Sequence, residues 1–123
     1  MRRMLYVDDN ADNIYLMQQI VAQRAHIEMV PVKSAADGLA AARSLQYDLI
    51  LLDQRLPDGL GSDVLVALKG AQPTAAIPVV LFSADDQIAK SAVAEWGADR
   101  FLAKPFEIVE LLEILDTYCP QID

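Results

Sequence analysis

The sequence predicts an α/β domain in which a doubly wound, five-stranded parallel sheet and five helices form a three-layer sandwich. Strand-like and helix-like segments alternate five times along the 123 residues, which is typical of a parallel sheet with helices on both faces. The length fits one ordinary domain, so we expect one unit over residues 1–123. Hydrophobic residues make up 54% of the chain, which is enough to form a core.

The elements follow from apolar patterning. The expected strands are short apolar runs, at residues 4–7, 27–32, 49–52, 78–82 and 100–103. The expected helices have apolar or alanine-rich faces, at residues 12–24, 34–44, 62–71, 86–96 and 107–118, the second and third counted with their capping serines.

Particular residues of the first half support these assignments. Pro31 lies within the second strand and suggests a sheet edge, because proline cannot donate to a strand ladder. Ser34 is an expected N-cap for the helix that runs through Ser44. The continuous apolar run at 49–52 is typical of a central strand that is buried on both faces.

The second half contains the clearer turn signals. Residues 54–61 predict a loop, because proline and two glycines fall within a few positions. Ser62 is the expected cap of the third helix, and residues 72–77 form a connector. Gly97 is a natural end for the fourth helix, and residues 120–123 are an expected tail.

Charge and composition argue against several classes of protein. The net charge is −8 and the isoelectric point is about 4.4, so direct binding of nucleic acid is not expected. No run approaches the roughly 18 consecutive apolar residues of a membrane span. The amino-terminus has too short an apolar run for a signal peptide. We therefore expect a cytoplasmic location without membrane insertion, and the single cysteine, Cys119, agrees with a reducing compartment.

Polar residues follow four of the predicted strands. Asp8 and Asp9 follow the first, Asp53 the third, Ser83 the fourth and Lys104 the fifth. The carboxyl ends of parallel strands lie at one edge of the sheet, so these side chains should share a pocket. Three close carboxylates repel one another unless a cation joins them, and oxygen ligands suit Mg²⁺. The pattern predicts a magnesium site with one carboxylate free to act as a nucleophile.

The chemistry of this pocket would be phosphoryl transfer. The carboxylate of Asp53 can attack phosphorus and form an acyl phosphate. Mg²⁺ would offset the repulsion between that carboxylate and the phosphoryl oxygens. Ser83 could donate its hydroxyl to a phosphoryl oxygen, and Lys104 could pair with Asp53 and later with the phosphoryl group. Taken alone, a serine at this place is most often a helix cap and a lysine is most often solvated, but the joint pattern of these residues is specific. A cis bond between Lys104 and Pro105 would direct the lysine inward.

These residues, in this order and spacing, resemble the receiver domain of a two-component response regulator of the single-domain type, over essentially the whole chain. The resemblance implies a flavodoxin-like fold. It also implies a phosphoprotein that is phosphorylated on Asp53 by a histidine kinase or a histidine phosphotransfer protein. It also implies that Asp9 and Asp53 hold Mg²⁺, that Asp8 helps through water, and that the backbone carbonyl of Arg55 is a further ligand.

The resemblance further implies a switch. Ser83 and Phe101 would form the switch pair, with the aromatic ring turning inward as the hydroxyl moves to the phosphoryl group. Because no output domain follows in this sequence, the expected output is the surface of the fourth helix, fifth strand and fifth helix, which would signal to a downstream protein. The first helix, bearing Tyr15 and Gln18, is the expected kinase-docking face. A monomer or weak homodimer is expected.

In this signalling role the chain is not an enzyme. Other functions remain open as alternatives. A haloacid-dehalogenase-like phosphatase also uses an aspartyl nucleophile and Mg²⁺, but it needs a second aspartate where Arg55 stands. A flavin-binding flavodoxin needs a phosphate loop after the first strand, where the acidic run at 8–12 would repel phosphate. The segment could also be a receiver cut from a larger hybrid kinase or regulator.

Overall fold

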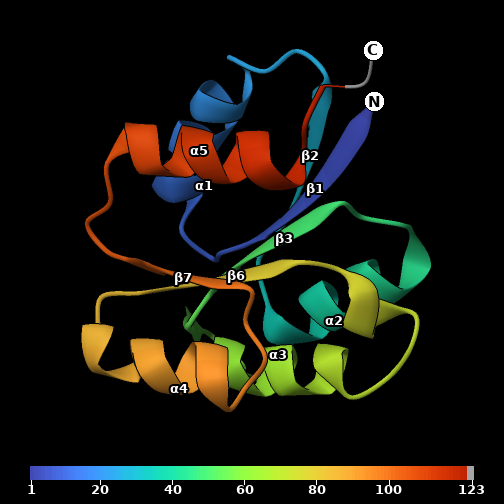
Figure 1. Cartoon of the computed structure of the whole chain (residues 1–123), viewed down its shortest axis with the longest axis vertical. Coiled ribbons are helices and arrows are strands. Elements are labelled where there is room, and N and C mark those ends of the chain that lie inside the picture. Colours follow the sequence, from blue (N-terminus) through green and yellow to red (C-terminus); the bar gives the residue numbers. More distant parts are fainter. Residues whose placement is uncertain (122–123) are drawn as a thin grey trace.

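The computed structural model describes residues 1–121 and contains one parallel sheet between two layers of helices (Figure 1). In spatial order the strands of this sheet are β2 (Ile27–Val32), β1 (Arg2–Val7), β3 (Leu49–Asp53), β6 (Val79–Ser83) and β7 (Arg100–Ala103). The helices are α1 (Ala11–Val21), α2 (Ala35–Ser44), α3 (Gly61–Lys69), α4 (Ala89–Ala94) and α5 (Ile108–Tyr118). The predicted five-stranded α/β fold is confirmed.

The two faces of the sheet carry separate halves of the core. Helices α1 and α5 cover one face, and α2, α3 and α4 cover the other (Figure 1). Side chains of β1 alternate between them: Met4 and Tyr6 contact the first layer, whereas Leu5 and Val7 contact the second. Strands β3 and β6 are buried along their whole length, which explains their continuous apolar sequence.

Elements of the first half agree closely with the predictions. Strand β2 lies at the edge of the sheet, as Pro31 indicated. The side chain of Ser34 caps α2 by accepting a hydrogen bond from the backbone N–H of Asp37 at 3.0 Å. Helix α1 begins after Asn10 and ends at Val21, three residues before the expected end.

The expected loop at 54–61 is corrected by the structure, because it contains an antiparallel ribbon formed by β4 (Arg55–Leu56) and β5 (Gly59–Leu60). The expected cap at Ser62 is wrong. Ser62 lies inside α3, and its backbone N–H donates to Oε1 of Gln54 at 2.8 Å. The longer glutamine side chain takes the capping role, and the helix begins at Gly61, two residues before the first helical residue expected after a cap at Ser62.

The connections around β6 are also more structured than expected. The connector before it contains a 3-10 turn at Thr74–Ala76. The fourth helix begins as a 3-10 turn at Asp86–Ile88 and ends at Ala94, two residues before its expected end. Gly97 then has a φ of 86°, a left-handed conformation that favours glycine. Of the expected tail at 120–123, residues 122 and 123 lie outside the described part of the chain.

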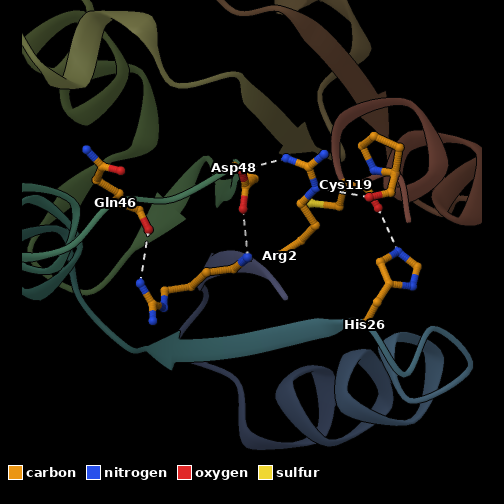
Figure 2. A network of polar contacts seen from close by, with 7 residues as sticks. Arg2, His26, Gln46, Asp48 and Cys119 are labelled. Atoms are coloured by element: carbon orange, nitrogen blue, oxygen red, sulfur yellow. Dashed lines mark hydrogen bonds and ion pairs between the residues drawn. The ribbon is translucent and has the colours of Figure 1, made fainter. Parts of the chain in front are cut away.

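A polar network closes the amino-terminal edge of the sheet (Figure 2). The guanidinium of Arg2 lies 3.4 Å from the Asp48 carboxylate and donates from Nε to the Pro120 carbonyl at 2.9 Å. The Nε2 of His26 donates to the carbonyl of Cys119 at 2.8 Å. These bonds tie the end of α5 to the starts of β1 and β2. Within residues 1–121, no helix has the length and apolar character needed to cross a membrane.

Candidate functional site

The carboxyl ends of four strands converge at the other edge of the sheet. Asp8 and Asp9 directly follow β1, and Asp53 is the last residue of β3. One carboxylate oxygen of each lies within 4.8 Å of the other two. Ser83 ends β6, and Lys104 directly follows β7. The structure therefore brings together the residues that the strand-end pattern selected.

Asp53 and Lys104 form the central ion pair of this site. The Nζ of Lys104 lies 3.1 Å from Oδ1 of Asp53. Only 8% of Asp53 is exposed, and this burial raises the pKa of its carboxyl group. The charge and hydrogen bond of Lys104 oppose that rise, and so does the backbone amide of Arg55. The site thus holds a buried carboxylate against one ammonium group.

Asp8 is held by three hydrogen bonds. Its Oδ2 accepts from the hydroxyl of Tyr6 at 2.7 Å and from Nδ2 of Asn13 at 3.2 Å, and its Oδ1 accepts from the backbone N–H of Asn10 at 3.0 Å. Burial, strengthened by the contact with Asp8, raises the pKa of Tyr6, so the phenol remains a donor. Asp9 is exposed. Tyr6 and Asn13 were not predicted as site residues, although both contact Asp8, from β1 and α1.

Ser83 is buried and already has one hydrogen bond. Its Oγ accepts from the backbone N–H of Asp85 at 3.0 Å, and the Asp85 carboxylate in turn caps the following 3-10 turn by accepting from Gln87 N–H at 3.1 Å. The backbone N–H of Lys104 donates to the Ser83 carbonyl at 2.9 Å. The peptide bond between Lys104 and Pro105 is cis.

Two further predicted residues lie at the margins of the site. The side chain of Arg55 is exposed, and its backbone is part of the β4–β5 ribbon. Phe101 is partly buried in the core cluster beneath α2, α3 and α4, alongside Ile88 and Trp96. Phe101 therefore lies on the layer that contains α4, one strand away from Ser83.

Segment 54–61 after Asp53 contributes residues that the sequence analysis did not select. Gly61, at the start of α3, approaches the backbone of Asp53 so closely that any Cβ there would collide with the Asp53 carbonyl. The Gly61 N–H donates to the Gln54 carbonyl at 2.7 Å. At the tip of the ribbon, Asp58 contacts the start of α2. The proline and glycines of this segment indicated a turn, but not which groups it would touch.

An apolar cavity of about 260 Å³ lies next to the ion pair, between α1 and the segment that follows β7. Its lining includes the following residues: Tyr6, Asn13, Leu16, Met17, Ile20, Lys104, Pro105, Phe106 and Ile108. Tyr15, Leu16, Ile108 and Val109 are exposed large apolar residues of α1 and α5. An apolar surface thus adjoins the charged pocket.

Comparison with known sequences identifies relatives over nearly the whole chain. The family model for the response regulator receiver domain matches residues 4–116. The transcriptional regulatory protein PcoR of Escherichia coli is 36% identical over 114 residues, which cover 91% of this chain and 49% of PcoR. The DNA-binding dual master transcriptional regulator RpaA of a Synechocystis strain is 36% identical over 116 residues, covering 91% and 46%. The chain spans about half the length of these curated relatives.

Solved structures share the same fold. The receiver domain of sensor histidine kinase PA1611 from Pseudomonas aeruginosa PAO1, crystallised with a magnesium ion coordinated in its active site cleft, matches with a TM-score of 0.85 at 24% identity, covering 95% of this chain and 96% of that one. A CheY-like response regulator receiver domain protein from Methanospirillum hungatei JF-1 matches with a TM-score of 0.83 at 25% identity, covering 95% and 92%. With the family match over residues 4–116, we conclude that the chain belongs to the receiver domain family of two-component response regulators.

Proposed function

We propose that this chain is a phosphoryl-accepting switch, in which Asp53 takes a phosphoryl group from a histidine kinase or a histidine phosphotransfer protein in a Mg²⁺-dependent reaction. The observation that carries the proposal is the 3.1 Å contact between Lys104 and Asp53 inside the cluster formed with Asp8 and Asp9. A buried nucleophilic carboxylate, a cation and two further carboxylates are the groups that this chemistry requires.

The donor set of the site fits Mg²⁺, because its ligands would all be oxygen atoms. Asp9 and Asp53 would hold the ion with the backbone carbonyl of Arg55. Asp8 already accepts three protein hydrogen bonds, which supports a role for it through water. When bound, the ion supplies positive charge that offsets repulsion between the carboxylates and the phosphoryl oxygens. The Mg²⁺ reported for the PA1611 receiver domain agrees with this assignment.

In the transfer step, a carboxylate oxygen of Asp53 attacks the phosphorus atom of a phosphohistidine. The O–P bond forms while the N–P bond breaks, and the imidazole leaves with the bonding electron pair. Lys104 favours the ionised carboxylate before the reaction and can donate to a phosphoryl oxygen after it. Because the Oγ of Ser83 accepts its hydrogen bond from Asp85, the hydroxyl proton of Ser83 is free for a second phosphoryl oxygen.

The response would spread from Ser83 to the output surface. Movement of Ser83 toward the phosphoryl group leaves space on the layer of Phe101, whose ring is only partly buried. Turning inward would bury more of that ring and displace α4, since the segment leading into α4 begins directly after Ser83. The phosphoryl group would bias an existing equilibrium between two arrangements.

The phosphodonor would dock beside the pocket. The apolar cavity of about 260 Å³ borders Lys104, and the exposed side chains of Tyr15 and Leu16 lie on the adjoining helix α1. An apolar patch around a charged centre fits a helical protein partner that presents one histidine.

The wider role follows the same lines. Residues 1–123 would act as one receiver domain, as a monomer or weak homodimer, in the cytoplasm, either alone or within a larger hybrid kinase or regulator. The net charge of −8 argues that these residues signal to a downstream protein and do not bind DNA themselves, although matched relatives are transcriptional regulators. Arg55 stands where a phosphatase would need its acid, so we propose a switch and not an enzyme.

Intact-mass measurement after incubation with acetyl phosphate and Mg²⁺ tests the proposal. The parent protein should gain one phosphoryl group that hydroxylamine removes, as expected for an acyl phosphate. Asp53→Asn keeps the shape of the side chain without its nucleophilic charge, and should gain none while remaining folded. Phosphoryl uptake by the Asp53→Asn protein would show that another residue is the acceptor.

A further inference from the structure

The β4–β5 ribbon that follows Asp53 has few stabilising interactions of its own. It pairs Arg55 with Leu60 and Leu56 with Gly59 around a two-residue turn, and most of it is exposed. A two-stranded ribbon alone is at best marginally stable in water. Its base is joined to α3 by the 2.7 Å hydrogen bond from Gly61 N–H to the Gln54 carbonyl, and Leu56 packs against the core on the α2, α3 and α4 side. The exposed tip at residues 57 and 58 is left to be held by another contact.

Asp58 provides that contact at the tip. Its Oδ1 accepts from the backbone N–H of Ala35 at 2.7 Å, and its Oδ2 accepts from the N–H of Ala36 at 3.0 Å. These are the first two residues of α2, whose N–H groups have no partner within the helix. The two backbone hydrogen bonds lower the pKa of Asp58. Asp58 therefore caps a helix that precedes it by more than twenty residues.

The start of α2 is in turn fixed to the strand that leads to the acidic pair. Gly38, in the first turns of α2, packs against Val7, and a Cβ at Gly38 would lie 3.2 Å from both Val7 methyl groups. Val7 directly precedes Asp8 in the chain. A continuous path of contacts thus runs from the end of β1, through α2 and Asp58, to the ribbon beside Asp53.

We propose that Asp58 is a positioning residue of the phosphoacceptor site, which fixes the backbone of Arg55 beside Asp53 by fastening the ribbon to α2. The inference deepens the proposed function and rests on it, because Arg55 would supply a carbonyl ligand to Mg²⁺. Without Asp58 the ligand must be ordered at the moment of binding, which weakens binding without unfolding the domain. Residues that orient metal ligands commonly contribute at least tenfold to metal affinity.

The competing explanation is that Asp58 only stabilises α2, and the chain offers controls for it. Ser34→Ala removes the other cap of the same helix end, the hydrogen bond to Asp37 N–H, but does not touch the ribbon. Asp37→Asn removes one negative charge from that helix end, and within residues 1–121 its carboxylate makes no hydrogen bond. Asp58→Asn keeps one acceptor oxygen and serves as a milder variant beside Asp58→Ala.

Two measurements on the full chain test the inference. Hydrogen exchange of the backbone amides at 55–60, in metal-free protein, reports the order of the ribbon, and calorimetric titration with Mg²⁺ reports the affinity. Asp58→Ala should speed exchange across the ribbon and weaken Mg²⁺ binding by about tenfold. Asp58→Asn should show a smaller change of both quantities, whereas Ser34→Ala and Asp37→Asn should leave both unchanged.

Unaltered ribbon exchange in both Asp58 variants would overturn the positioning role. Equal loss of Mg²⁺ affinity in Ser34→Ala and Asp58→Ala would also overturn it, because helix stability would then explain the effect. Failure of the parent protein to bind Mg²⁺ would contradict the proposed function instead. The exchange measurement would still decide whether Asp58 orders the Arg55 backbone, since it needs no metal.

Discussion

The hydroxyl of Tyr6 donates a 2.7 Å hydrogen bond to the Asp8 carboxylate beneath the acidic cluster. Both side chains are buried, with 3% and 1% of their surface exposed. Tyr6 belongs to β1 and its ring packs near Phe82 of β6, with centroids 6.2 Å apart. Tyr6 therefore connects the hydrophobic core on the α1 and α5 side to the proposed metal site, because its ring packs in the core and its hydroxyl binds Asp8.

Tyr6→Phe tests this link with little change in packing volume. The variant leaves Oδ2 of Asp8 with only the amide of Asn13, so a buried carboxylate loses a donor. We expect a loss of about 1.5–3 kcal/mol in the free energy of unfolding, the range for hydrogen bonds to charged groups. Urea denaturation of metal-free protein measures it, and Tyr15→Phe, at an exposed position, is the control. An unchanged free energy of unfolding would mean that water replaces the phenol.

Asp53→Asn should stabilise the metal-free protein at neutral pH. Burial raises the pKa of Asp53 despite Lys104, so the folded state holds its proton more tightly than the unfolded state does. Between the ordinary and the raised pKa the folded state binds more protons, and stability falls as the pH rises through that interval. An asparagine does not titrate, so the Asp53→Asn protein does not lose stability in this way.

Urea denaturation at a series of pH values in a chelating buffer checks this expectation. The parent protein should lose stability relative to Asp53→Asn as the pH rises above the ordinary range for aspartate, and the difference should persist at neutral pH. Asp63→Asn, on the exposed side of α3, controls for the change in net charge. A variant that is less stable than the parent at neutral pH would show that the pairing of Asp53 with Lys104 outweighs burial.

Gly61→Ala should distort the site from its backbone side. The new Cβ would collide with the carbonyl of Asp53, which is backbone and cannot move aside as a flexible side chain could. We expect a loss of about 1–3 kcal/mol in the free energy of unfolding, typical of overpacking, together with slower phosphoryl uptake. Gly59→Ala is the matched control, since a Cβ there meets no atom within 4 Å. Equal free energies of unfolding and equal rates of phosphoryl uptake in the two variants would contradict a role for the close contact between Gly61 and the Asp53 backbone.

The sequence predicted the fold and the convergence of strand ends well for a physical reason. Runs such as that in β3 are apolar throughout only when both faces of a strand are buried, and each polar residue that ends such a run must lie at the sheet edge. Asp53 and Ser83 could therefore be placed from local patterns alone.

Contacts between distant segments could not be predicted in this way. The ribbon of β4 and β5 has strands of two residues, too short for any periodic pattern. Gln54 caps α3 in place of Ser62, and Asp58 adds a second cap to α2 beside Ser34, because tertiary packing makes contacts with helix ends that local sequence does not indicate. The role of Tyr6 could not be predicted either, since an aromatic residue in a buried strand normally indicates only a core position.

Ser83→Ala tests the proposed switch. The variant retains Asp53 and Lys104, so it should still accept a phosphoryl group. It lacks the hydroxyl that would move to that group, so the phosphoryl group can no longer bias the positions of Phe101 and α4. NMR shifts of residues 86–101, with and without the phosphoryl mimic beryllofluoride, should be large in the parent protein and small in Ser83→Ala. The comparison must be made at saturating mimic, because the missing hydroxyl also removes one hydrogen bond to it. Shifts of full size in the variant would show that the signal reaches α4 by another route, most directly through the backbone of Lys104, which is hydrogen-bonded to the Ser83 carbonyl.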